Sequence, residues 1–231
     1  MAKYCKYYGL VLYMDCLECE EKYCRRPKVK NKIVVGIDQS YKDTGISMSM
    51  NGHIKTIGHC FTANLCNNSL KRQKLNMRLL EVLEKVSKLS IKYDADVMVV
   101  IERIRLQSQG FINIDYIKSI GALNAMIVDT CMKYNFKVYS VDTRAWKSAV
   151  VGTSKEKQNK YGIDPKKWPT ILWLINKGFE ESIKEEVSGR KKKGVIEKNG
   201  ERFTYNDNAA DSAAISLFPF KGSNDLLKEE H

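Results

Sequence analysis

The sequence has no long hydrophobic run, and its first residues, Met-Ala-Lys-Tyr-Cys, lack the apolar stretch of a secretory signal. A helix that spans a membrane needs about 20 consecutive, mostly apolar residues, and a signal peptide needs a shorter apolar core. Neither pattern occurs in the sequence. We therefore expect a cytoplasmic protein that makes no contact with a membrane.

Acidic residues are too few to balance the basic ones. The chain has 27 Asp and Glu against 39 Lys and Arg, which gives a formal net charge of +12 and a pI near 9.3. An excess of this sign favours a polyanionic partner, nucleic acid above all, over a neutral metabolite. A soluble protein that is simply basic is the alternative that charge alone leaves open.

The seven cysteines form an odd number in a sequence without a secretory signal, which favours thiols or metal ligands over a disulfide framework. Four of them, Cys5, Cys16, Cys19 and Cys24, lie close together at the N-terminus. Four thiolates can close a tetrahedral zinc site. We predict one structural Zn²⁺ in a cysteine-rich element over residues 1–30, which ends in a basic connector near Lys30, with unmetallated thiols as the alternative.

The remaining residues alternate between strand and helix patterns. Apolar runs predict buried strands over 33–37, 97–101 and 136–141, and Asn51-Gly52 predicts a hairpin turn between strands 46–50 and 54–61. Helical spacing predicts a helix that Ser69 caps and helices over 114–133, 168–176 and 208–217. The order predicts an α/β domain over 31–220, with a mixed five-stranded sheet covered by helices on both faces.

Two further segments read as irregular. The Gly- and Lys-rich residues 188–199 are predicted to form an exposed loop or hairpin. The chain after Pro219 is polar, and we expect a frayed tail over 221–231.

Two of the apolar strands end in an acidic residue, Asp38 and Glu102. If these strands are adjacent and parallel, both carboxylates lie at one edge of the sheet. Asp207 and Asp211 are one turn apart at the start of the last helix and can face the same point. Capping of that helix and its dipole is the alternative explanation for the last pair.

Carboxylates that are held together repel one another, and such a cluster persists by binding divalent cations. Hard oxygen ligands select Mg²⁺ or Mn²⁺. Two such ions about 4 Å apart activate a water and stabilise the leaving oxygen in phosphodiester hydrolysis. The carboxylates therefore predict a site with two metal ions.

Three segments resemble the motifs of the RuvC family of Holliday-junction resolvases, which have the RNase H-like fold. Gly-Ile-Asp38-Gln-Ser-Tyr-Lys-Asp-Thr-Gly45 resembles the first motif, Ile-Glu102-Arg-Ile-Arg the second, and Asn-Ala-Ala-Asp211-Ser-Ala-Ala-Ile the last. Together they cover most of residues 32–217. The resemblance implies an RNase H-like domain in which Asp38, Glu102 and Asp211 bind two Mg²⁺ or Mn²⁺ ions.

The fourth metal ligand is where the sequence departs from the family. RuvC-type enzymes usually place their last two ligands three residues apart, and Asn208 stands at that spacing before Asp211. The nearby acid is Asp207, four residues before. Both spacings keep a pair on one helix face, so we predict Asp207 and retain Asn208 as the alternative.

A segment over 144–155 is similar to the basic stretch with which the family holds DNA phosphates. The loop that follows Glu102 offers a cation and an aromatic ring that can stack on an unpaired base, although the ring of Phe111 could equally anchor the next helix. A solvated loop is the alternative for the lysine run near 190. The residues predicted to contact DNA are Arg105, Phe111, Arg144, Lys147, Lys155, Arg190, Lys191, Lys192 and Lys193.

The resemblance implies a homodimeric, Mg²⁺-dependent crossover junction endodeoxyribonuclease. It would cut four-way DNA junctions symmetrically in recombination and repair, and two subunits are needed because one site cuts one strand. The resemblance, with the N-terminal cysteine cluster as an addition to the family core, implies a phage-type variant in a bacterial or phage-infected cell. The alternatives are a nuclease of the same fold acting on flaps or single strands, and a zinc-dependent DNA-binding protein without activity, which the intact carboxylates argue against.

Overall fold

The computed structural model describes residues 3–5, 9–11, 30–103, 114–152, 163–187 and 195–230. Of the cysteine-rich element it describes the backbone of β1 (Lys3–Cys5), which pairs antiparallel with β2 (Gly9–Val11). The following predicted site residues lie outside the described ranges: Cys16, Cys19, Cys24, Arg105, Phe111, Lys155, Arg190, Lys191, Lys192 and Lys193. The zinc site and these DNA contacts therefore stay predictions.

A mixed six-stranded sheet forms the centre of the fold, in the order β11-β7-β6-β3-β4-β5. β3 (Asn31–Asp38), β4 (Asp43–Met50) and β5 (His53–Phe61) form an antiparallel meander. β6 (Ala95–Glu102) runs parallel to β3, and β7 (Lys137–Val141) runs parallel to β6. The predicted strands and the mixed sheet are confirmed.

The sheet has one strand more than the five predicted, because the end of the chain does not fray. After the 3-10 turn η3 (Asn224–Leu226), β11 (Lys228–Glu229) pairs antiparallel with β7. The amide of Glu230 continues this pairing by donating to the carbonyl of Val138 at 2.9 Å. Backbone hydrogen bonds thus order a segment whose polar side chains carry no strand pattern.

The turn between β4 and β5 follows the predicted chemistry. Asn51 and Gly52 both adopt positive φ, at 50° and 81°. Two successive residues in this conformation match the right-handed twist of a hairpin, and Asn-Gly adopts it at the lowest steric cost.

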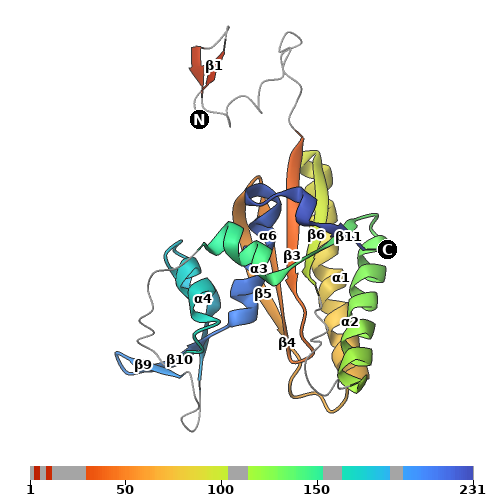
Figure 1. Ribbon diagram of the computed structural model, residues 1–231, viewed down its shortest axis with the longest axis vertical. Coiled ribbons are helices and arrows are strands. Elements are labelled where there is room, and N and C mark those ends of the chain that lie inside the picture. The colour runs from red at the N-terminus through yellow and green to blue at the C-terminus, as the bar shows by residue number, and fades with distance from the viewer. Residues whose placement is uncertain are drawn as a thin grey trace.

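Two long helices, α1 (Asn68–Tyr93) and α2 (Ile114–Met132), lie side by side on one face of the sheet (Figure 1). Their inward side chains, including Leu79, Leu83 and Ile127, pack with β3 and β6 in one core. Asn67, and not Ser69, caps α1: its backbone is extended and its side chain accepts from the amide of Leu70 at 2.9 Å. Ser69 already lies within the first turn.

The opposite face is covered by α6 (Asp207–Lys221), α3 (Thr143–Trp146), the π-helical turn η2 (Lys147–Val151) and α4 (Trp168–Ile175) (Figure 1). A short α5 (Glu180–Ile183) leads into a small antiparallel sheet of β8 (Lys184–Glu186), β9 (Ile196–Lys198) and β10 (Glu201–Tyr205). Helices therefore cover both faces, as predicted. Within the described ranges, no helix has the length and apolarity needed to cross a bilayer.

The last helix continues past its predicted end at Leu217. Pro219 lies inside α6 and is buried, together with Leu217 and Phe218. A proline removes one helical hydrogen bond, but burial of the neighbouring apolar side chains offsets that loss. The expectation that the tail begins at Pro219 was therefore wrong.

α6 packs directly on the backbone of β3 and β4, because only small residues separate them. A Cβ atom at Gly36 would lie 2.2 Å from the carbonyl oxygen of Ser212, and one at Gly45 would lie 1.9 Å from that of Asn208. The hydroxyls of Ser47 and Ser212 are 2.6 Å apart. This close approach fixes the height of the N-terminal turn of α6 above the sheet.

We expect Gly45→Ala to destabilise the protein by about 2 kcal/mol, because the new methyl group would collide with helix backbone that cannot rotate away. Urea unfolding measures the change. Gly58→Ala on β5 is the matched control, since its Cβ would make an ordinary 3.5 Å contact with the carbonyl of Ile46. Equal stability of the two variants would contradict the packing described here.

Candidate active site

Asp38 and Glu102 end two neighbouring parallel strands. β3 and β6 pair in register up to Ile37 opposite Ile101, so the next residue of each strand emerges at the same edge. Apolar strands buried on both faces carry the chain to this point, and the polar residue comes where the strand leaves the core. The structure therefore brings together the two carboxylates that the strand pattern predicted.

The first turn of α6 adds Asp207 and Asp211 to this edge. The pKa of Asp38 is raised well above its ordinary value, firstly by burial and then by the negative charges of Asp211, Glu102 and Asp207. Lys147 acts in the opposite direction. Electrostatic coupling of this kind shows that the four predicted carboxylates lie near one another.

Asp211 is a buried carboxylate that a neighbouring lysine neutralises only in part. Its side chain is 14% exposed, and burial raises its pKa to about 6, although Lys147 lowers it. The Lys147 ammonium lies 3.7 Å from Oδ2, which is long for a direct ion pair. Oδ1 is buried and makes no hydrogen bond of normal geometry, although the hydroxyl of Thr170 lies near enough to lower the pKa of this carboxyl. A buried carboxylate oxygen without such a bond is costly unless a ligand completes it.

Glu102 is held by two side chains that follow β7. The hydroxyl of Thr143 donates to Oε1 at 2.6 Å, and the indole of Trp146 donates to Oε2 at 3.3 Å. Asp142 caps this short helix by accepting from the amide of Arg144. These contacts fix the orientation of the carboxylate before any ligand arrives.

Asp207 and Asn208, the two candidates for the fourth ligand, have different partners. Asp207 pairs with the Lys167 ammonium at 2.5 Å and contributes its charge to the pKa values of Asp38 and Asp211. The amide of Asn208 donates to the backbone carbonyl of Asp43 at 2.6 Å, which ties it to β4. Asp207 thus contributes a negative charge to the cluster, and the choice between Asp207 and Asn208 as the fourth ligand stays a prediction.

The carboxylates fit Mg²⁺ or Mn²⁺ by their chemistry. They are hard oxygen donors, one buried oxygen makes no hydrogen bond of normal geometry, and burial, with a smaller contribution from the neighbouring negative charges, raises the pKa values of Asp38 and Asp211. Their oxygens do not converge as tightly as the ligands of one closed site. Among the described residues, the one group with three ligand atoms within 4.8 Å of one another is Asp43, His59 and Glu185.

That tighter group lies beside the carboxylate cluster, and a hydrogen bond and an ion-pair contact join its members. His59 Nδ1 is 2.7 Å from Asp43, and its Nε2 is 3.2 Å from Glu185. The amide of Asn206 donates to both carboxylates. Sequence reasoning missed this group because its members come from β4, β5 and β8, and no local pattern connects them.

Sequence reasoning also missed Thr143, Trp146 and Lys167. Thr143 and Trp146 lie in the basic segment over 144–155 or directly before it. Their spacing of three residues places both on one helix face, and this spacing could have indicated that they act together. Arg144 is exposed, whereas Lys147 is half-buried and lies over the Trp146 ring at 5.0 Å. Lys147 thus neighbours the carboxylates, and its predicted contact with DNA stays a prediction.

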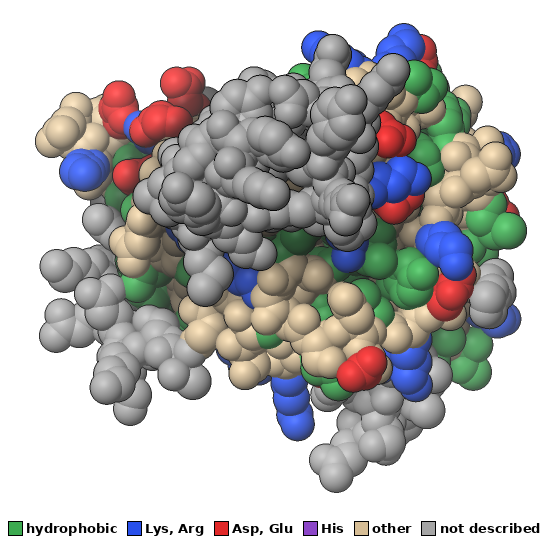
Figure 2. Space-filling view, turned by 90° about the horizontal axis from the view of Figure 1, so that it is seen from above, with side chains coloured by type: hydrophobic (Ala, Val, Ile, Leu, Met, Phe, Trp, Pro, Cys, Tyr) green, Lys and Arg blue, Asp and Glu red, His purple; other side chains and the backbone are tan. Residues whose placement is uncertain are grey.

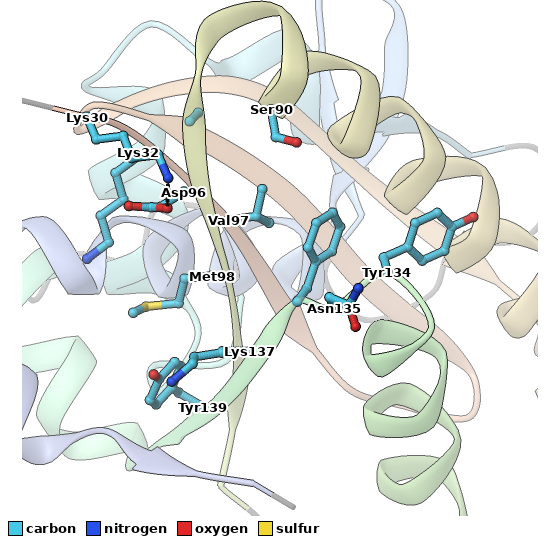
Figure 3. A pocket seen from close by; sticks show the side chains of 12 residues that line it. Lys30, Lys32, Ser90, Asp96, Val97, Met98, Tyr134, Asn135, Lys137 and Tyr139 are labelled. Atoms are coloured by element: carbon cyan, nitrogen blue, oxygen red, sulfur yellow. Dashed lines mark hydrogen bonds and ion pairs between the residues drawn. The ribbon is translucent and has the colours of Figure 1, made fainter.

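A cavity of about 610 Å³ lies at the other end of the parallel strands (Figure 3). Lys30, Lys32 and Lys137 line it, together with Asp96 and Tyr139. Lys30 already pairs with Asp96 at 2.6 Å. None of the predicted site residues lines this cavity.

The sheet order and the helices on both faces define an α/β fold of the RNase H-like type. No family model and no curated protein matches the sequence at a significant level. Among solved structures, RuvC of Thermus thermophilus in complex with a Holliday junction substrate matches with a TM-score of 0.50 and 14% identity, over 86% of this chain and 99% of that one. A second structure of Thermus thermophilus RuvC matches with the same values. The chain therefore has a RuvC-like fold.

We expect Asp211→Asn to stabilise the protein in the absence of divalent metal. Burial raises the pKa of Asp211 in the folded protein to about 6, whereas the same group ionises at lower pH in the unfolded chain. The folded protein therefore loses stability as pH rises through the raised pKa. The gain should approach about 3 kcal/mol at most at pH 8 and vanish below pH 4. Asp38→Asn should behave in the same way.

Thermal melts between pH 4 and pH 8 in EDTA measure this effect. The exposed Asp129 on α2 provides the control, because Asp129→Asn removes the same charge away from the cluster. A melting temperature that falls in both site variants at pH 8 would mean that the carboxylates hold the fold together.

Proposed function

We propose that this protein is a divalent-metal-dependent endonuclease that cuts four-way DNA junctions. The observation that carries the proposal is the convergence of Asp38, Glu102 and Asp211, which come from two parallel strands and the last helix, at one edge of a RuvC-like sheet. Thermus thermophilus RuvC, which shares this fold, is described in complex with a Holliday junction.

Asp38, Glu102, Asp207 and Asp211 would hold two Mg²⁺ or Mn²⁺ ions. When bound, such a pair of ions supplies an activated water and stabilises the leaving oxygen of the phosphodiester. The chain's own part is to hold these carboxylates in place. Thr143 and Trp146 fix the rotamer of Glu102, and the direct packing of α6 on Gly45 fixes Asp207 and Asp211.

The cation set around the site is suited to a polyanion. Lys147 and Lys167 lie against the carboxylates, and Arg144 is exposed on the adjoining helix. Arg144 adds an exposed cation beside these ion pairs, which supports DNA binding at the carboxylate edge. On the face seen in Figure 2, basic and acidic side chains are interspersed where they are visible. Two cuts in one junction require two sites, so we propose a homodimer.

Cleavage of labelled four-way junction, flap, duplex and single-stranded DNA, with and without Mg²⁺, tests the function directly. We expect the junction to be cut most efficiently and symmetrically, and no cutting in EDTA. Preferential cutting of flaps or single strands would support the nuclease activity and contradict the four-way junction as its substrate. Junction binding without any cleavage would favour an inactive DNA-binding protein.

Asp38→Asn, Glu102→Gln and Asp211→Asn should each lower single-turnover cleavage by at least about 100-fold, as loss of a metal ligand does. Junction affinity should stay the same or rise slightly, since a negative charge facing phosphate is removed. Asp129→Asn should cut at the normal rate. Variants that cut normally in Mg²⁺, or that lose folding along with cleavage, would contradict the assignment.

Lys147→Gln tests whether this residue meets DNA as well as Asp211. A phosphate contact releases counterions, so its loss should lower the slope of log affinity against log salt by about 1. Lys88 on α1 pairs with Glu84 and serves as the control. An unchanged slope for Lys147→Gln in filter-binding titrations would limit its role to the carboxylate cluster.

A further inference from the structure

The group of His59, Asp43 and Glu185 connects three separate parts of the fold. His59 is near the end of β5, Asp43 begins β4, and Glu185 is the middle residue of β8 in the small sheet. Nδ1 of His59 makes a hydrogen bond with Asp43 at 2.7 Å, and Nε2 lies at ion-pair distance, 3.2 Å, from Glu185. A carboxylate oxygen beside each ring nitrogen favours the form of the imidazole in which both nitrogens carry a proton.

The same two carboxylates hold the residue that starts α6. Asn206 is the N-cap: its side-chain oxygen accepts from the amide of Ala209 at 2.8 Å. Its amide nitrogen donates to Asp43 at 2.6 Å and to Glu185 at 2.5 Å. Asn206 is buried, so its orientation depends on these acceptors. The position of the Asn206 cap therefore depends on two carboxylates, and contact with His59 holds these carboxylates close to each other.

We propose that protonated His59 is a positioning residue for the candidate active site: it bridges Asp43 and Glu185, holds the Asn206 cap, and thereby sets the first turn of α6 with Asp207 and Asp211. The role in catalysis rests on the proposed function, whereas the role in holding the helix does not. Loss of the proton leaves two carboxylates facing each other, with Asp207 close by on the helix.

The charges around His59 favour its protonated form. The hydrogen bond to Asp43 raises the pKa of His59 above its ordinary value, burial lowers it, and the charges of Asp43 and Glu185 add to the rise. Arg78 on α1 opposes them, and it is itself paired with Glu81. The stabilisation of the first turn of α6 by protonated His59 is thus complete at acidic pH, and it is lost as pH rises through the raised pKa of His59.

Hydrogen exchange at the amides of Ala209 and Ala210 tests the positioning role without any activity assay. These amides donate to the side chain and the carbonyl of Asn206, so they report the first turn. After correction for intrinsic exchange, we expect wild-type protection to fall about tenfold between pH 6 and pH 9 as local opening becomes easier. His59→Gln should be weakly protected at both pH values.

His53→Gln is the matched control, because His53 is an exposed histidine on the same strand. It should follow the wild-type exchange profile throughout. NMR titration of the His59 ring signals gives the midpoint, which should coincide with the loss of protection. Glu185→Gln should move that midpoint to lower pH.

Cleavage supplies the second measurement. The single-turnover rate of His59→Gln relative to wild type should be about tenfold lower at pH 6.5 and approach one at pH 9, with junction affinity unchanged. Taking this ratio removes the pH dependence that both proteins share. If wild type proves inactive while the exchange pattern holds, the proposed function fails and the positioning role stands.

Two results would overturn the inference. One is protection of Ala209 and Ala210 that is independent of pH and identical in wild type and His59→Gln. The other is Zn²⁺ shifting the His59 signals at a ratio of one ion per chain with release of the ring proton, because a metal would then replace the proton as the bridge.

Discussion

The direct contact between α6 and the backbone of β3 and β4 is the constraint on which the site depends. Gly36 and Gly45 leave no room for a side chain beneath the helix, and Ser47 and Ser212 share a hydrogen bond in the same interface. Close packing tolerates little displacement. Backbone contact therefore sets the distance of Asp207 and Asp211 above the sheet and from Asp38. Such a contact is more rigid than one made through flexible side chains.

This packing brings negative charges together in a buried place at a cost in stability. The raised pKa values of Asp38 and Asp211 express that cost, and the partial neutralisation by Lys147 and Lys167 limits it. Binding sites commonly retain such unfavourable arrangements because the ligand relieves them. If the site binds cations as proposed, they would relieve this cost.

Local patterns in the sequence predicted the strands that end at Asp38 and Glu102 and the Asn51-Gly52 turn, because apolar runs and turn residues act over a few positions. Partners that come from distant segments escaped prediction. Nothing near Glu102 indicates that Thr143 and Trp146 hold its carboxylate, and nothing near His59 indicates Glu185. β11 was missed because two polar residues carry no periodicity.

The carboxylates at the sheet edge come from opposite ends of the described chain. Asp38 lies on the first strand of the large sheet and Asp211 on its last helix, so a ribosome completes β3 and β6 long before α6 emerges. Until α6 docks, the backbone of Gly36 and Gly45 has no cover on that face. Contacts between such distant segments form late in folding. A nascent chain therefore acquires the complete carboxylate cluster only with its final helix.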